Sequence, residues 1–312
     1  MKTGTYTFHI KLEEAAALPA YKGSTFRGVL GHALKQTVCA IKHQECNNCI
    51  LKSACLYALV FETGYALPRH KRARVSSVPH PMVIVPPLNT KTNFRRGDTL
   101  SCDLLLFGEI NRNLPYFIYA FKQMGKIGIG KHINGQKARF SLEKVTHRHD
   151  TIYPKKQGQM TLPDNLIDVD LLPAETLSLD RVEIKIITPL RINVKTQGPP
   201  ALPFPDLIRS FIRRNTALLN TWGNGEPDLN YSTLTDKAKK ITILEKQLSW
   251  FDWQRYSSRQ EKKMFMGGLT GHIVYQGKIA PFIPLLRMAE IVHAGKNTAF
   301  GLGKIAFKTL HQ

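Results

Sequence analysis

The spacing of apolar residues predicts the same order of elements in each half of the chain. In the first half, residues 5–12 and 99–107 alternate as strands, and residues 140–145 form another strand. A helix is expected at 114–124, and an earlier one begins at Ser24 or Thr25. The apolar residues of this first helix recur at helical spacing: Phe26, Val29, Leu30, Ala33, Leu34 and Val38.

The second half repeats this order of elements with different residues. Residues 181–187 alternate as a strand, and a helix with one apolar side begins near Asp206. Residues 264–275 predict a pair of strands, followed by a helix at 281–292 and a strand at 305–309. Strand, helix, strands, helix, strand is the order of a ferredoxin-like unit. We therefore expect an α+β chain of two tandem ferredoxin-like (RRM-like) domains.

Prolines mark the segment between the two halves. Pro154, Pro163 and Pro173 fall in a stretch of mixed composition, so a linker is expected at 151–178. The N-terminal domain then spans residues 1–150 and carries a cysteine-rich insert at 39–55. The C-terminal domain spans residues 179–312 and contains a glycine-rich loop.

The charge of the chain favours a polyanionic partner. Its 312 residues include 44 Lys and Arg but 23 Asp and Glu, which gives a formal net charge of +21. Nucleic acid is the commonest partner of so basic a surface. The longest apolar run, Cys55–Phe61, has seven residues, far fewer than the roughly 20 of a membrane-spanning helix. The N-terminus alternates like a strand and lacks a signal-peptide core, so a cytoplasmic protein with no membrane partner is expected.

Two loops rich in glycine and lysine follow helices at matching places. The first runs from Gly125 to Phe140 and carries Lys126 and Lys131; the second runs from Gly295 to Lys304. Glycine lets backbone N–H groups approach a phosphate closely, and lysine supplies the charge. The alternative is a tight helix-to-strand connection with glycine just after the helix.

Four of the five cysteines, Cys39, Cys46, Cys49 and Cys55, fall within 17 residues. Because cytosolic proteins seldom keep disulfides, this spacing favours a structural Zn²⁺ site with four thiolate ligands. An iron–sulfur cluster on the same ligands, or cysteines that are reduced or disulfide-linked, remain alternatives. Cys102 alternates within a strand and is expected in the core.

Four segments carry a family resemblance: 18–28, 250–260, 267–271 and the C-terminal run 289–305. Together with the four cysteines they resemble the RAMP superfamily of CRISPR proteins, and within it a subgroup of endoribonucleases that process precursor crRNA. The resemblance implies metal-independent cleavage of repeat RNA by its 2′-OH, which leaves a 2′,3′-cyclic phosphate and a 5′-OH, with no catalytic cofactor. It also implies subunits of a CRISPR effector complex as further partners, and a monomer or homodimer.

The first helix holds the catalytic candidates. At about 100° per residue, His32 and Lys35 lie opposite the apolar stripe, and Gly28 and Gly31 leave room on that face. The resemblance points to the same helix, since several family members use a histidine there with the help of Tyr and Lys. We expect His32 to act as general base or acid, Tyr21 as a hydroxyl partner, and Lys35 as the stabilising charge. The alternative is a solvated helix face.

RNA contacts are expected from the two loops, the first helix and an aromatic-basic segment near Trp250. His293 is also a rival catalytic candidate, although a histidine in the last turn of a helix is favoured there by the helix dipole. The expected RNA-binding residues are Arg27, Lys126, Lys131, Arg255, Ser257, Arg259, His293, Gly295, Lys296, Asn297, Thr298, Gly301, Gly303 and Lys304. Two other functions stay open: a non-catalytic RAMP subunit that binds crRNA in an effector complex, and a zinc-containing regulator that binds DNA.

Overall fold

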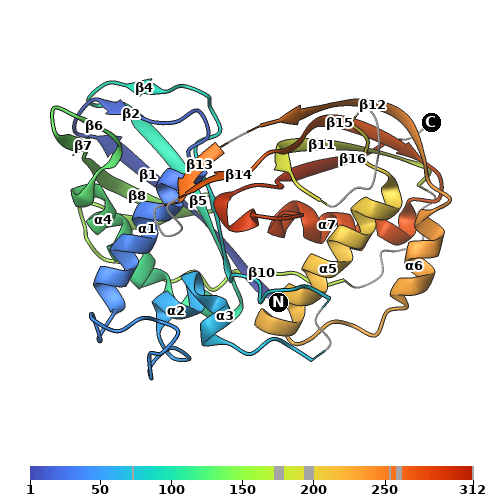
Figure 1. Cartoon of the computed structure of the whole chain (residues 1–312), viewed down its shortest axis with the longest axis horizontal. Coiled ribbons are helices and arrows are strands. Elements are labelled where there is room, and N and C mark those ends of the chain that lie inside the picture. The colour runs from blue at the N-terminus through green and yellow to red at the C-terminus, as the bar shows by residue number, and fades with distance from the viewer. Residues whose placement is uncertain (72–73, 172–178, 193–199, 253, 258–261, 311–312) are drawn as a thin grey trace. The chain divides into compact units, whose positions relative to one another are not determined.

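The computed structural model describes the chain apart from residues 72–73, 172–178, 193–199, 253, 258–261 and 311–312, and no side chains between 253 and 265. The chain forms two compact units (Figure 1). The first comprises Met1–Lys71 and Ser77–Asp168, and the second comprises Arg72–Ser76 and Val169–Gln312.

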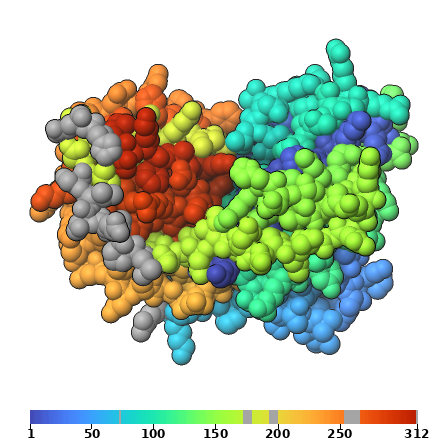
Figure 2. All heavy atoms as spheres, turned by 180° about the vertical axis from the view of Figure 1, so that it is seen from behind, coloured from blue at the N-terminus to red at the C-terminus, as the bar shows by residue number. Residues whose placement is uncertain are grey.

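The first unit is built on an antiparallel sheet with the strand order β3-β5-β1-β8-β9, and β10 pairs with β1. When the first four strands of this sheet are numbered as they follow in the chain, their order across the sheet is 2-3-1-4, which is the ferredoxin-like arrangement. The segment from β8 to β10, yellow-green in Figure 2, forms much of this unit's visible surface. The strands of the sheet are β1 (Lys2–Leu12), β3 (Met82–Val85), β5 (Thr99–Phe107), β8 (Phe140–His147), β9 (Asp150–Pro154) and β10 (Ile167–Asp168).

Two helices cover the apolar side of this sheet and pack on each other. They are α1 (Gly23–Val38) and α4 (Leu114–Ile127). Phe8 of β1 stacks on Phe121 of α4 with ring centroids 3.9 Å apart, and both side chains are fully buried. The smaller elements are β2 (Ala16–Ala17), α2 (Leu56–Phe61), α3 (Thr63–Ala66), β4 (Asn93–Phe94), η1 (Gly108–Asn113), β6 (Ile129–Ile133) and β7 (Gln136–Ala138).

The second unit repeats the arrangement with the strand order β12-β15-β11-β16, again 2-3-1-4 in chain order. Phe204 at the start of α5 packs edge-on against the rings of Tyr275 and Phe282 in the core. The strands are β11 (Arg181–Leu190), β12 (Thr242–Phe251), β13 (Gln254–Ser257), β14 (Lys262–Phe265), β15 (Gly268–Gln276) and β16 (Ile305–Leu310). The helices are α5 (Phe204–Trp222), α6 (Tyr231–Ala238), η2 (Ala280–Phe282), α7 (Ile283–Val292) and η3 (Thr298–Phe300).

The fold class predicted from the sequence is confirmed, and several segments differ from expectation, β3 among them. Strand β12 was missed because nearly all of its side chains are exposed, so no buried face marks it. The loop expected after Gly125 forms the β6–β7 hairpin. Two pieces of the expected linker, β9 and β10, join the first sheet. Within the described part of the chain, every helix is too short or too polar to cross a bilayer.

Candidate active site and RNA-contacting loops

Helix α1 presents His32 to solvent because its other side is fixed in the core. Phe26, Leu30 and Leu34 are buried, and the helical turn places His32 away from them. The Nε2 atom of His32 lies 3.1 Å from the side-chain nitrogen of Gln36, one turn later. A side-chain amide nitrogen is a donor only, so Nε2 is the acceptor in this contact.

Lys35 faces α2 and the cysteine segment. Its Nζ lies 5.5 Å from the centre of the Tyr57 ring, a cation–π contact, and its charge also acts on the thiol of Cys46. In the described part of the chain, His32 forms no hydrogen bond with Lys35 or Tyr21. The structure thus places His32 and Lys35 on one helix but does not join them in a hydrogen-bonded group.

Tyr21 lies in the turn that leads into α1. Burial raises the pKa of its phenol far above the ordinary value, so the hydroxyl is neutral. The neighbouring Lys22 was not singled out in the sequence, yet it is fully buried. Its Nζ donates to the carbonyls of Ala20 at 3.1 Å and Asn89 at 2.6 Å. This lysine fixes the turn that carries Tyr21, and nothing in the spacing of the sequence distinguishes it from a surface lysine.

Gly28 and Gly31 of α1 have different surroundings. Gly28 has open space where a side chain would begin. At Gly31 an added Cβ would lie 2.8 Å from the ring of Phe61, whose face is also covered by the guanidinium of Arg27 at 4.9 Å. The expectation that both glycines leave room for RNA is therefore wrong for Gly31, which instead allows α1 and α2 to pack closely.

His293 is a structural residue of the C-terminal loop. Its ring is 1% exposed, and its Nδ1 lies 3.1 Å from the carbonyl oxygen of Leu302. Burial lowers the pKa of His293 to about 3, so the ring is neutral. The guanidinium of Arg214 donates to the carbonyls of Val292 at 2.8 Å and His293 at 2.9 Å, which caps the end of α7. The ring of His293 therefore packs the loop, and the RNA contact expected of this residue stays a prediction.

The glycines of this loop serve close packing. The N–H of Gly301 donates to Thr298 at 2.8 Å, and that of Gly303 donates to Pro189 at 3.0 Å. At Gly303 a Cβ would lie 1.8 Å from the carbonyl oxygen of Ala294, so this position excludes any side chain. Both N–H groups are used within the protein, and so the expected cradle of free backbone donors for phosphate is wrong at these glycines.

The remaining residues of the C-terminal loop differ in backbone conformation and in exposure to solvent. Gly295 has φ 75°, and a Cβ there would lie 2.6 Å from the carbonyl oxygen of Arg191. Asn297 also has a positive φ, Thr298 is buried, and Lys304 is half-buried. Lys296 is exposed, so its charge can reach a ligand in solvent.

The first glycine-rich loop likewise uses its glycines for packing and exposes its lysines. Gly128 ends α4 with a positive φ and donates to Met124 at 3.0 Å. A Cβ at Gly130 would lie 2.5 Å from the carbonyl oxygen of Ala17. Lys126 in the last turn of α4 and Lys131 in β6 are both exposed.

The aromatic-basic segment is described in part. Arg255 and Ser257 belong to β13 and pair with Met264 and Lys262 of β14, but their side chains lie outside the described residues, as does Arg259. Beside this segment, the indole N–H of Trp250 donates to Asp252 at 2.8 Å, and the ring is half exposed.

The four clustered cysteines are free thiols of intermediate burial in a segment of turns. Burial raises the pKa of Cys46, and the neighbouring thiols of Cys55 and Cys39 raise it further. Among the described residues, however, no three His, Cys, Asp or Glu side chains are arranged to hold a metal ion. The predicted Zn²⁺ site is therefore not confirmed by this geometry.

Sequence reasoning missed a polar cluster on the open face of the first sheet. His9 of β1 lies between Ser101 Oγ, 3.1 Å from Nδ1, and Thr146 Oγ1, 3.2 Å from Nε2. Partial burial and the charge of Lys144 lower the pKa of His9. The alternation of each strand predicts that these residues point away from the core. Which strands lie side by side could not be deduced from one sequence, so the cluster was missed.

Comparison with known proteins adds family matches to this geometry. Residues 184–305 match the model of the CRISPR-associated endoribonuclease Cas6, and residues 1–165 match a family model described as an N-terminal domain, AF_1859_N. An uncharacterized protein of Archaeoglobus fulgidus is 27% identical over 293 residues, covering 92% of this chain and 91% of its own.

Solved structures share the fold at low identity. A Thermus thermophilus Cas6 in its product complex matches with a TM-score of 0.56 and 12% identity, over 98% of this chain and all of the other. A partial Cas6-RT-Cas1–Cas2 complex matches with a TM-score of 0.60 and 14% identity over the whole of this chain. This chain spans 46% of that longer one.

Two ferredoxin-like units, the second with a glycine-rich loop before its last strand, form the arrangement expected from the resemblance to RAMP proteins. The chain belongs to the AF_1859_N family, whose model matches residues 1–165, and its residues 184–305 match the Cas6 endoribonuclease model.

Proposed function

We propose that this protein is an endoribonuclease that cuts precursor CRISPR RNA within its repeats by metal-independent attack of the RNA's own 2′-OH. The observation that carries the proposal is the solvent-exposed His32 on α1 of a chain whose residues 184–305 match the Cas6 model. RNA is required because DNA lacks the attacking hydroxyl.

The reaction needs two proton transfers and charge stabilisation. A base takes the proton of the 2′-OH, and the 2′ oxygen forms a bond to the adjacent phosphorus. The bond from phosphorus to the 5′ oxygen then breaks, and this oxygen receives a proton. The products are a 2′,3′-cyclic phosphate and a 5′-OH. Cations beside the phosphate stabilise the charge that develops in the transition state.

His32 is the residue we propose for proton transfer. Its Nε2 accepts a hydrogen bond in the free protein, which favours the role of base for the first step. Tyr21 is proposed as the hydroxyl partner of His32, and burial raises the pKa of its phenol, so the hydroxyl keeps its proton. Lys35 supplies positive charge on the same helix as His32.

RNA binding is proposed to use side chains of the loops rather than their backbone donors. Exposure supports Lys126, Lys131 and Lys296 as contacts with phosphate groups. The glycines beside these lysines hold the loop backbones in shape. Subunits of a CRISPR effector complex are further proposed partners.

Incubation of labelled repeat RNA with the protein in EDTA tests this function. We expect cleavage at one position of the repeat, with a cyclic phosphate on the upstream product. Binding without cleavage would contradict the enzymatic proposal and support a crRNA-binding subunit. A preference for duplex DNA would instead support a DNA-binding regulator.

A further inference from the structure

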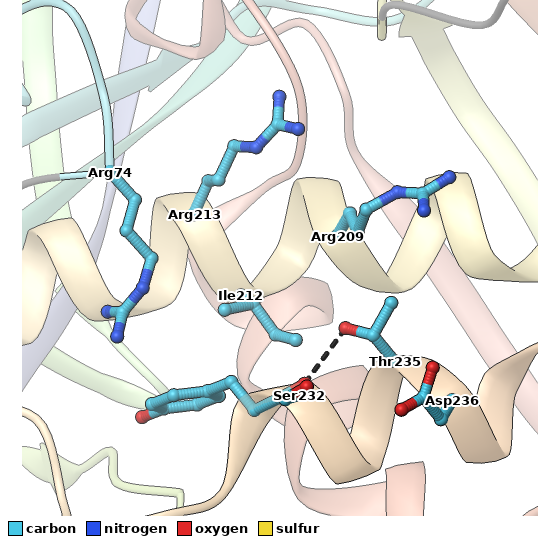
Figure 3. Close-up of a pocket in the computed structure, with 8 residues that line it drawn as sticks. Arg74, Arg209, Ile212, Arg213, Ser232, Thr235 and Asp236 are labelled. Carbon is cyan, nitrogen blue, oxygen red and sulfur yellow. Dashed lines mark hydrogen bonds between the residues drawn. The ribbon is translucent and has the colours of Figure 1, made fainter.

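A pocket of about 420 Å³ lies in the second unit between α5 and α6 (Figure 3). Its walls include three arginines, Arg74, Arg209 and Arg213, together with the hydroxyl-bearing Tyr231 and Ser232. It does not include any residue assigned above to cleavage or RNA binding. The pocket therefore needs its own explanation.

Arg213 and Ser232 are the pocket's available donors. Arg213 is exposed on α5, one turn after Arg209, and the two side chains rise from the same side of the helix in Figure 3. Among the described residues, neither the guanidinium of Arg213 nor the hydroxyl of Ser232 has a hydrogen-bond acceptor. The pocket thus offers donors and positive charge to a ligand from solvent.

The other charged groups of the pocket are compensated within the protein. Arg74 lies 4.7 Å from the centre of the Tyr231 ring and pairs with Glu226 at 2.5 Å. Arg209 pairs with Asp206 in the first turn of α5. The lining carboxylate, Asp236, pairs with Lys239 at 2.8 Å.

One of these ion pairs and a hydrogen bond within α6 give the pocket a fixed wall. The Arg74 side chain is held from both sides by Tyr231 and Glu226, and the hydroxyl of Thr235 donates to the backbone carbonyl of Tyr231 at 2.8 Å (Figure 3). Ile212 adds an apolar surface between the arginines. The uncompensated charge in this setting is that of Arg213.

We propose that this pocket binds a phosphate group of the RNA strand, away from the phosphate that is cut. A planar guanidinium such as that of Arg213 donates two parallel hydrogen bonds to phosphate oxygens. This inference rests on the proposed RNA-binding function, and the phosphate of a free nucleotide is the other source of the same chemistry.

The test compares Arg213→Gln with Arg287→Gln, which removes an exposed arginine from α7 of the same unit. Affinity for labelled repeat RNA is measured in EDTA across a series of KCl concentrations. Loss of one phosphate contact lowers the slope of log affinity against log salt by about one. We expect that change in Arg213→Gln but not in Arg287→Gln, with an unchanged cleavage rate at saturating RNA in both.

A second arm separates the two phosphate sources. The melting temperature of each protein is measured with AMP and without RNA. AMP stabilisation that is lost in Arg213→Gln, with an unaltered salt slope, would assign the pocket to a free nucleotide and overturn the RNA contact. If wild type, Arg213→Gln and Arg287→Gln show the same salt dependence of RNA affinity, and AMP stabilises none of them, the proposal that the pocket binds phosphate would be overturned. Wild-type protein that binds no RNA would defeat the proposed function, while AMP would still report on the pocket.

Discussion

His32 and His293 are the same type of residue in opposite environments. His32 is exposed on a helix face, whereas His293 is buried and hydrogen-bonded to a backbone carbonyl. The sequence suggested both as candidates, His32 because it lies opposite the apolar stripe of its helix and His293 because it directly precedes the second glycine-rich loop. Burial decides between them, since a group that exchanges protons with RNA has to be reached by RNA.

Replacing His32 with alanine removes the proposed base. We expect the cleavage rate at saturating RNA to fall by roughly 10²- to 10⁴-fold while RNA affinity stays unchanged. His149→Ala is the matched control, because this histidine is exposed in the turn between β8 and β9. Near-native cleavage by His32→Ala, measured in single-turnover assays, would rule out the assignment.

The buried His293 predicts how stability depends on pH. Its pKa is about 3 in the folded protein and about 6.5 when unfolded, so acid protonates the unfolded chain first. This contribution to stability is complete above pH 6.5 and is lost as the pH falls from 6.5 toward 3. By pH 5 the loss is about 2 kcal/mol.

Urea unfolding of wild type and His293→Asn at pH 7 and pH 5 measures this effect. Asparagine tolerates the positive φ of 62° at this position and removes the titrating group. The fall in unfolding free energy between the two pH values should be smaller in the variant by about 2 kcal/mol. An equal fall in both proteins would show that His293 is not the titrating group.

At the scale of elements, the C-terminal loop is held in place by the close packing of its glycines. The backbone of Gly303 approaches that of Ala294, and its N–H is bonded to Pro189, so the loop is packed against the end of β11. Lys296 remains at the surface of this packed loop. Local spacing indicated an important loop but could not indicate where its N–H groups are bonded.

Gly303→Ala should destabilise the protein strongly. The new Cβ would meet the Ala294 carbonyl at 1.8 Å, and φ is 73°. Gly158→Ala is the control, because φ is 65° there and the space around it is open. Strained backbone alone costs about 1–3 kcal/mol, so Gly158→Ala should lose about that much and Gly303→Ala clearly more. Equal melting temperatures for the two variants would contradict the packing role.

The Zn²⁺ site expected in the cysteine segment between α1 and α2 can be tested directly. If Cys39, Cys46, Cys49 and Cys55 bind Zn²⁺, freshly purified protein should contain about one zinc per chain by elemental analysis. Cys46→Ser should release it, whereas Cys102→Ser, in the core of the first unit, should keep it. Protein without zinc or iron would agree with the free thiols described above.

On the scale of the whole molecule, the element order was largely predictable. The alternation in β1, β5 and β11 and the helical spacing in α1 each reflect one buried face, and such a pattern is local. Strand β12 lacks a buried face, and β9 and β10 are defined by their pairing partners. Those elements depend on contacts distant in sequence, which no local pattern records.

Of the candidate site, the sequence alone could predict only which side chains lie on the exposed face of a helix. The exposure of His32 follows from the helical turn of α1. Other features depend on tertiary contacts. They are the hydrogen bond from Lys22 to the Asn89 carbonyl, the packing of Gly31 on Phe61, and the pocket between α5 and α6. Residue type and spacing therefore indicated His32, Tyr21 and Lys35 as candidates, but not the tertiary contacts of Lys22 and Gly31 or the pocket.

The most direct test of the account is a repeat RNA with a single 2′-deoxy nucleotide at the scissile position, assayed in EDTA. The account predicts that wild-type protein binds this RNA as tightly as the unmodified repeat but leaves it intact, while it cuts the unmodified repeat without divalent ions. Cutting of the deoxy substrate at a similar rate, or cleavage that appears only when divalent ions are added, would contradict it.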